Sequence, residues 1–105
     1  MAKLSVSTLT AENGNLVIAL AGEIDVSSAD SFYNQIAELY QSNPSPIVFD
    51  CKELTFIDST ALGAFVKVNR MASGNGHKVT IQGAKNNVKK LFVICALDKV
   101  FAFEG

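Results

Sequence analysis

The residues best suited to chemistry in this chain lie in one short segment, Asp58, Ser59 and Thr60, which follows the apolar pair Phe56-Ile57. Aspartate, serine and threonine cap helices, and the apolar pattern that comes next predicts a helix beginning at Ser59. A serine at that position is exposed, and a phosphate group on it would lie at the positive end of the helix dipole. The segment is therefore suited to phosphorylation, although the same residues also suit an ordinary helix start.

The helix predicted over residues 59–73 has two faces of different character. At about 100° per residue, six apolar residues fall on one broad arc that is expected to pack on a sheet, namely Ala61, Leu62, Ala64, Phe65, Val68 and Ala72. The opposite side, expected to face water, carries Ser59, Gly63, Val66 and Arg70. Gly63 costs about 1 kcal/mol relative to alanine, and Val66 is apolar where polarity is expected. Both suit a surface on which another protein docks, because glycine allows close approach and valine offers an apolar contact.

Little else in the chain is suited to catalysis. The single histidine, His77, follows the far end of the predicted helix, so residues rising about 1.5 Å each place it roughly 20 Å from Ser59. That distance excludes a serine–histidine pair, and the chain has neither a Gly-x-Ser-x-Gly elbow nor a P-loop. A carboxylate pair, Asp25 and Asp58, is left open as an arrangement for acid–base chemistry. We predict a protein that is not an enzyme and that uses no cofactor or metal ion.

Composition disfavours several classes of protein. A chain of 105 residues, 49% apolar and with a formal net charge of -1, is expected to form one domain and offers no field that would attract nucleic acid. Cys51 and Cys95 lie outside any metal-binding motif and are expected to be buried thiols. No apolar run has the length of a signal peptide core or a membrane span, so the protein is expected to be cytoplasmic and not to insert into a membrane. One group of lysines is interpreted as a solvated face, namely Lys85, Lys89, Lys90 and Lys99.

The elements that must position the motif follow from apolar periodicity and turn signals. Strands are predicted over residues 4–7, 16–21, 47–49, 79–81 and 100–103, and helices from a cap at Ser27 to about Tyr40, over 59–73, and from a cap at Asn86. Gly22 is expected to end the second strand, Ser27 and Asp30 to form a capping box, and the strand at 47–49 to be covered on both faces. The buried faces of the first and third helices are expected to comprise Phe32, Ile36, Leu39 and Tyr40, and Val88, Leu91, Phe92 and Cys95. The order β-β-α-β-α-β-α-β predicts an α/β fold, a mostly parallel sheet packed with helices.

With these elements in place, the motif resembles a known one. Residues 58–63, Asp-Ser-Thr-Ala-Leu-Gly, resemble the phosphoacceptor motif of STAS domains, specifically the bacterial anti-sigma factor antagonists. Further segments match in the same order along nearly the whole chain: Gly22-Glu23-Ile24-Asp25, Ile47-Val48-Phe49-Asp50, residues 88–92 and residues 97–101. The family often has glycine where this chain has Ala61 and Ala96, and its members usually continue into a further amphipathic helix after the last strand. The resemblance implies a STAS domain over residues 1–105, without that C-terminal helix.

The resemblance also implies a function, partner switching. In that mechanism, the unphosphorylated antagonist binds an anti-sigma factor that is also a serine kinase and so frees a sigma factor, and phosphorylation of the motif serine releases the antagonist. On this chain the serine is Ser59, and a phosphatase would reset it. The predicted partner-binding residues are Asp25, Asp58, Ser59, Thr60, Gly63, Val66 and Arg70. Two further points stay open. A bare flank of the sheet could be closed in a homodimer. The domain could also be an accessory or sensor module, which would bind a small ligand or a partner protein in a stress-signalling, transporter or lipid-transport assembly.

Overall fold

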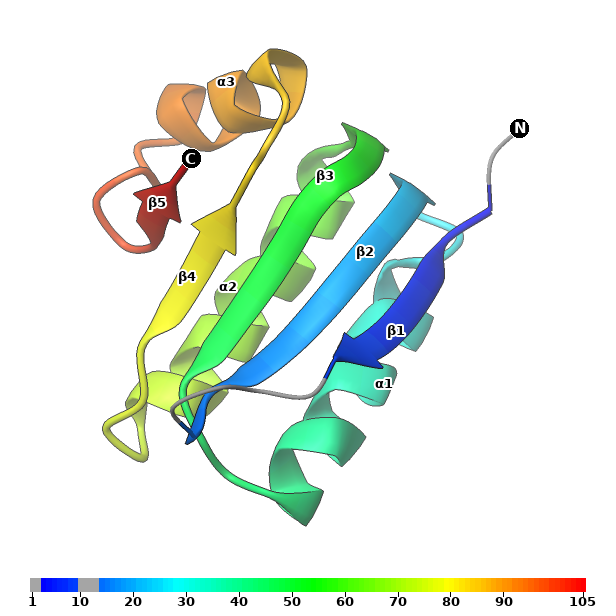
Figure 1. Cartoon of the computed structure of the whole chain (residues 1–105). Helices are drawn as coiled ribbons and strands as arrows, with labels where there is room; N and C mark the ends of the chain where they lie inside the picture. Colours follow the sequence, from blue (N-terminus) through cyan, green and yellow to red (C-terminus); the bar gives the residue numbers. More distant parts are fainter. Residues whose placement is uncertain (1–2, 10–13) are drawn as a thin grey trace.

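The computed structural model describes residues 3–9 and 14–105, and its elements follow the order β-β-α-β-α-β-α-β (Figure 1). The predicted order of strands and helices is therefore confirmed. The elements are β1 (Ser5–Leu9), β2 (Leu16–Ile24), α1 (Ala29–Ser42), β3 (Ile47–Ile57), α2 (Ser59–Ser73), β4 (Val79–Gln82), α3 (Asn86–Ile94) and β5 (Ala102–Glu104).

The strands form one mostly parallel sheet in the order β1-β2-β3-β4-β5, in which β1 pairs antiparallel with β2 and the other pairs are parallel. Right-handed crossovers between strands that are neighbours in both sequence and sheet place each connecting helix on the same face. Figure 1 accordingly shows α1 and α2 behind the sheet, and no helix of the described residues covers its other face. The expectation that the strand at 47–49 is covered on both faces is therefore wrong, because Ile47 and Phe49 are buried while Val48, which points the other way, is half-buried.

The core between the sheet and the helices is centred on Phe65 of α2. The centre of its ring lies 4.9 Å from the ring centre of Phe32 on α1, 5.4 Å from that of Phe49 on β3 and 5.4 Å from that of Phe92 on α3. The buried residues of α2 are the six that the periodicity predicts, and Ser59 and Thr60, which precede them, are exposed. This packing fixes the direction in which Ser59 points.

Strand β2 departs from the prediction at Gly22, which does not end the strand. Gly22 has φ +92°, and the pairing with β3 shifts register between Ala19 and Ala21 and again between Gly22 and Glu23. A Cβ atom at Gly22 would lie 2.1 Å from the carbonyl oxygen of Lys3, so the backbone of the chain before β1 passes where a side chain would otherwise be. The bulge lets β2 reach Ile24, opposite Ile57 at the end of β3.

The start of α1 and both ends of α3 also differ from the prediction. Asn86 does not cap α3 but is its first residue, after Lys85, and no side chain caps this helix. Helix α1 begins at Ala29 after Ser28, and no side chain caps it; the Ser27 hydroxyl donates to Asp25, and the predicted capping box does not form. Helix α3 ends at Ile94, and Ala96 turns the chain at φ +58°, so Cys95 leaves the buried face and is exposed. Leu39 and Leu91 are half-buried rather than buried. In the part of the chain that the structure describes, no helix combines the length and the apolar character needed to cross a membrane.

Candidate functional site

The N-terminus of α2 is built by Asp58. Its backbone is extended, with φ -115° and ψ -175°, and its Oδ1 accepts a hydrogen bond of 2.9 Å from the amide of Ala61. This is the geometry of an N-cap aspartate, and it places Ser59 as the first residue of the helix, with an exposed side chain. The predicted position of Ser59 at an exposed helix start is confirmed.

The second oxygen of Asp58 holds the loop between β2 and α1. Its Oδ2 accepts a 3.0 Å hydrogen bond from the amide of Val26, so one carboxylate joins two segments that are distant in the sequence. The parallel pairing of β2 with β3, which ends with Ile24 opposite Ile57, brings the carboxyl ends of both strands to the same edge of the sheet. The tertiary structure thereby places the Asp25 loop beside the Ser59 motif.

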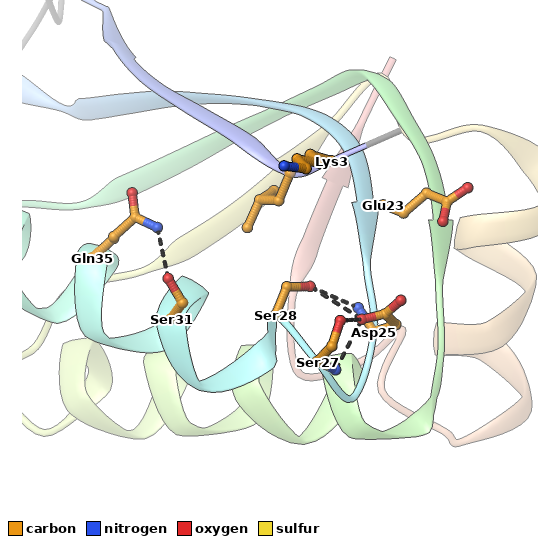
Figure 2. Close-up of a pocket in the computed structure, with 8 residues that line it drawn as sticks. Lys3, Glu23, Asp25, Ser27, Ser28, Ser31 and Gln35 are labelled. Carbon is orange, nitrogen blue, oxygen red and sulfur yellow. Dashed lines mark hydrogen bonds between the residues drawn. The ribbon is translucent and has the colours of Figure 1, made fainter. Parts of the chain in front are cut away.

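Asp25 organises that loop from within. Its Oδ1 accepts hydrogen bonds from the Ser27 hydroxyl at 2.6 Å and the Ser27 amide at 2.9 Å, while the Asp25 amide donates to the Ser28 hydroxyl. The hydrogen bond from the Ser27 hydroxyl, followed by that from the Ser27 amide, holds the pKa of the Asp25 carboxyl below its usual value. The side of this loop that faces β1 borders a cavity of about 460 Å³, and Figure 2 shows Lys3, Glu23, Ser31 and Gln35 around it with Asp25.

The other residues of the predicted site lie along α2. Thr60, Gly63 and Arg70 are exposed, and Val66 is half-buried. Gly63 and Ser59 lie one turn apart on the helix surface, and a Cβ atom added at Gly63 would meet nothing within 4 Å. The structure thus brings the Asp25 loop, Asp58 and the first turns of α2 into one surface, and Arg70 lies about three turns further along the helix.

His77 lies at the opposite end of α2 from Ser59, as the helix length predicts. Its amide donates to the carbonyl of Ala72 in the last turn, and its Nδ1 shares a 2.5 Å hydrogen bond with the hydroxyl of Tyr40. Neither contact involves the motif, so His77 cannot serve Ser59 as a base. Within residues 3–9 and 14–105, no group of three or more potential ligands could hold a metal ion.

Two exposed apolar residues beside the motif were not predicted from the sequence. Val26 is 73% exposed in the loop that Asp58 holds, and Phe56 is 44% exposed near the end of β3. Apolar groups displayed around a polar centre are common where proteins dock. The sequence carries one signal for Val26, a single apolar residue among the polar residues 25–28, but its place beside Ser59 depends on the sheet.

Comparison with known proteins agrees with this geometry. The family model of the STAS domain matches residues 7–104. The chain is 27% identical, over 86 residues, to the anti-sigma-B factor antagonist of Bacillus subtilis (strain 168), a match that covers 82% of this chain and 78% of that protein. Among solved structures, it is similar to an anti-sigma factor antagonist from Mycobacterium paratuberculosis, with a TM-score of 0.80 at 21% identity over 95% of this chain and 86% of that one. It is also similar to the phosphorylated form of the Bacillus cell fate determinant SpoIIAA, with a TM-score of 0.72 at 18% identity over 94% and 90% of the two chains.

The five-stranded sheet with its helices on one face is thus the α/β fold of the STAS class. This chain belongs to the STAS domain family. The relatives whose sequence and fold it shares include anti-sigma factor antagonists, so the resemblance indicated by the motif is confirmed.

Proposed function

We propose that the protein is an anti-sigma factor antagonist that works by partner switching in the cytoplasm. In its unphosphorylated state it binds an anti-sigma factor serine kinase and frees a sigma factor, phosphorylation of Ser59 ends that binding, and a phosphatase restores it. The observation that carries the proposal is the exposed Ser59 hydroxyl at the first position of α2, beside a cap carboxylate that also holds the Asp25 loop. Its role is regulatory rather than enzymatic.

The same geometry supports a phosphorylated protein that stays folded. Among the described residues, the amides of Ser59 and Thr60 donate to no protein acceptor, so they remain available at the positive end of the helix. A phosphate there adds about -1.5 to -2 charges at neutral pH and meets these amides and the helix dipole. We therefore expect the modification to leave the fold intact.

The partner, in contrast, would meet a changed surface. The proposed docking residues are Asp25, Asp58, Ser59, Thr60, Gly63, Val66 and Arg70. A partner that fits a neutral hydroxyl beside the Asp58 carboxylate would have to desolvate a dianion next to an existing negative charge, at a cost of several kcal/mol. Phosphorylation of Ser59 therefore weakens binding through the partner's side of the interface.

The proposal is tested by pull-down from the native cell extract with wild type, Ser59→Asp and Ser59→Ala in parallel. Wild type and Ser59→Ala should retain an ATP-binding serine kinase of the anti-sigma type. The amount of kinase that Ser59→Asp retains should be lower by about tenfold or more. Circular dichroism of all three proteins checks that the fold is unchanged. Equal retention of the kinase by wild type and Ser59→Asp would contradict the proposal.

A second candidate function, a sensor or accessory module, is favoured by one observation. The cavity of about 460 Å³ beside Asp25 has the size of small-ligand pockets, which is about 300–1,000 Å³ (Figure 2). Its polar groups already bond to one another, as Ser27 and Ser28 do with Asp25 and Gln35 does with Ser31, so few are left to recognise a ligand. A saturable rise in melting temperature with a small ligand, with no kinase retained by wild type, would favour this candidate over partner switching.

A further inference from the structure

A groove of about 240 Å³ runs between α1 and α2, next to the Ser59 motif; it shares Thr60 and Gly63 with the proposed docking residues but does not include Val66 or Arg70. Its lining consists of Ala29, Asp30, Tyr33, Thr60, Gly63, Ala64 and Lys67. Thr60 lines the groove and follows Ser59 directly, so the groove borders the motif. The volume lies below the range of about 300–1,000 Å³ typical of small-molecule pockets, and it suits a single side chain better than a ligand or cofactor.

Gly63 lines the groove, and nothing among the described residues demands glycine at this position. It lies within α2, where glycine is a poor helix former, and its φ is not in the left-handed region. A Cβ atom at this position would meet nothing within 4 Å, so the isolated protein tolerates a larger residue there without any clash. Glycine at this position therefore leaves the backbone of α2 open to close approach by a partner.

The groove combines an apolar interior with opposite charges at its two sides. Ala29 and Ala64 are buried and contribute no polar side-chain atoms. Asp30 stands on α1 and Lys67 on α2, both exposed, and in the described ranges neither belongs to an ion pair. The ammonium of Lys67 lies 5.6 Å from the centre of the Tyr33 ring, so the wall beside it is aromatic. Such a surface complements an apolar side chain with a basic residue on one side and an acidic residue on the other.

We propose that this groove, which we call the α1–α2 groove, receives one apolar side chain of the anti-sigma factor, with a basic group of that protein facing Asp30 and an acidic group facing Lys67. The partner thus lies across both helices and not along α2 alone. This inference rests on the proposed function, because it concerns the same partner, and it adds Asp30, Tyr33 and Lys67 to the surface that contacts it.

The test measures affinity by calorimetry, with the purified anti-sigma kinase that wild type retains as the probe. Gly63→Ala and Gly63→Leu fill the groove, while Asp30→Lys and Lys67→Glu reverse its charges. Two matched controls make the same charge changes elsewhere, Glu38→Lys further along α1 and Lys90→Glu on α3, both at exposed positions. Thermal unfolding of every variant separates loss of binding from loss of structure.

We expect Gly63→Ala to raise the melting temperature by roughly 4–8 °C, because alanine is the better helix former, and yet to weaken binding by about fivefold or more. Gly63→Leu should weaken it further, and Asp30→Lys and Lys67→Glu should each weaken it by about tenfold while both controls bind like wild type.

Three other outcomes would contradict either the groove or the proposed function. Groove variants that bind like wild type, while Ser59→Asp does not, would overturn the groove and leave partner switching intact. Loss of binding in the controls as well would show a non-specific charge effect and would also overturn the groove. If wild type retains no anti-sigma kinase at all, the proposed function fails, and this inference fails with it.

Discussion

Asp58 joins two segments that lie 32 residues apart in the sequence, and it does so with the two oxygens of one carboxylate. Oδ1 caps α2 at the amide of Ala61, and Oδ2 holds the loop before α1 at the amide of Val26. A serine next to such a residue keeps a constant orientation, because the helix start and the neighbouring loop are held by the same group. Asp58 is therefore expected to position the site as well as to contact a partner.

Replacement of Asp58 should show how much its two hydrogen bonds stabilise the fold. Asp58→Ala removes the cap and the link to Val26 and is expected to lower the free energy of unfolding by about 1–2 kcal/mol. Asp58→Asn keeps an oxygen that can cap Ala61 but cannot accept both bonds, so its loss should be smaller. Asp98→Ala, which changes an exposed aspartate in a turn, serves as the control and should stay within about 0.5 kcal/mol of wild type. Urea unfolding measures all three, and equal stability of Asp58→Ala and wild type would show that the carboxylate bonds contribute nothing.

At the scale of the element, β2 reaches the site through an irregularity at Gly22. Gly22 adopts φ +92° within the strand, and the carbonyl oxygen of Lys3 occupies the space where a Cβ atom would be. The register shift beside it allows Ile24 to pair opposite Ile57, which sets the Asp25 loop next to Asp58. One glycine therefore aligns two strands whose ends carry the site.

A methyl group at Gly22 should disturb this alignment. Gly22→Ala combines left-handed backbone strain with a backbone clash and is expected to destabilise the protein by at least about 2 kcal/mol. Gly76→Ala is the matched control, because Gly76 has φ +77° but open space around it, and its cost should be about 1 kcal/mol. Thermal or urea unfolding compares the two. A cost no larger at Gly22 than at Gly76 would mean that the approach of Lys3 does not constrain β2.

At the scale of the whole molecule, Phe65 connects the site helix to the rest of the core. Its ring contacts rings from α1, β3 and α3, and its ring centre lies 6.4 Å from that of Phe101, just before β5. Cys51 is buried in the same core, where burial raises the pKa of its thiol to about 12, whereas Cys95 is exposed. Alkylation of Cys51 therefore requires the molecule to open, and its rate reports the stability of the core.

Phe65→Leu should speed that reaction. The smaller side chain is expected to lower the free energy of unfolding by about 1–2 kcal/mol, which corresponds to roughly 5- to 30-fold faster alkylation of Cys51 by iodoacetamide in a Cys95→Ser background. The internal control is Cys95 itself, whose alkylation in a Cys51→Ser background should be unaffected by Phe65→Leu. If Cys51 reacts at the same rate in both proteins, the five aromatic rings do not form one cooperative core.

Much of the molecule follows from the sequence alone. The order of the elements, the bounds of α2, its six buried residues and the exposed Ser59 at its start depend on apolar periodicity and capping, which are local properties of the chain. The STAS resemblance likewise rests on short segments that can be read in order.

Other features depend on residues that are remote in the sequence, and the tertiary structure alone decides them. The exposure of Cys95 and the start of α1 at Ala29 depend on where each helix leaves the core, and the bulge at Gly22 depends on the path of Lys3. The link from Asp58 to Val26, the exposure of Val26 beside the motif and the groove between α1 and α2 arise because parallel strands bring their ends to one edge and right-handed crossovers bring their helices to one face. Periodicity determines which face of an element is buried, but only packing determines which elements meet.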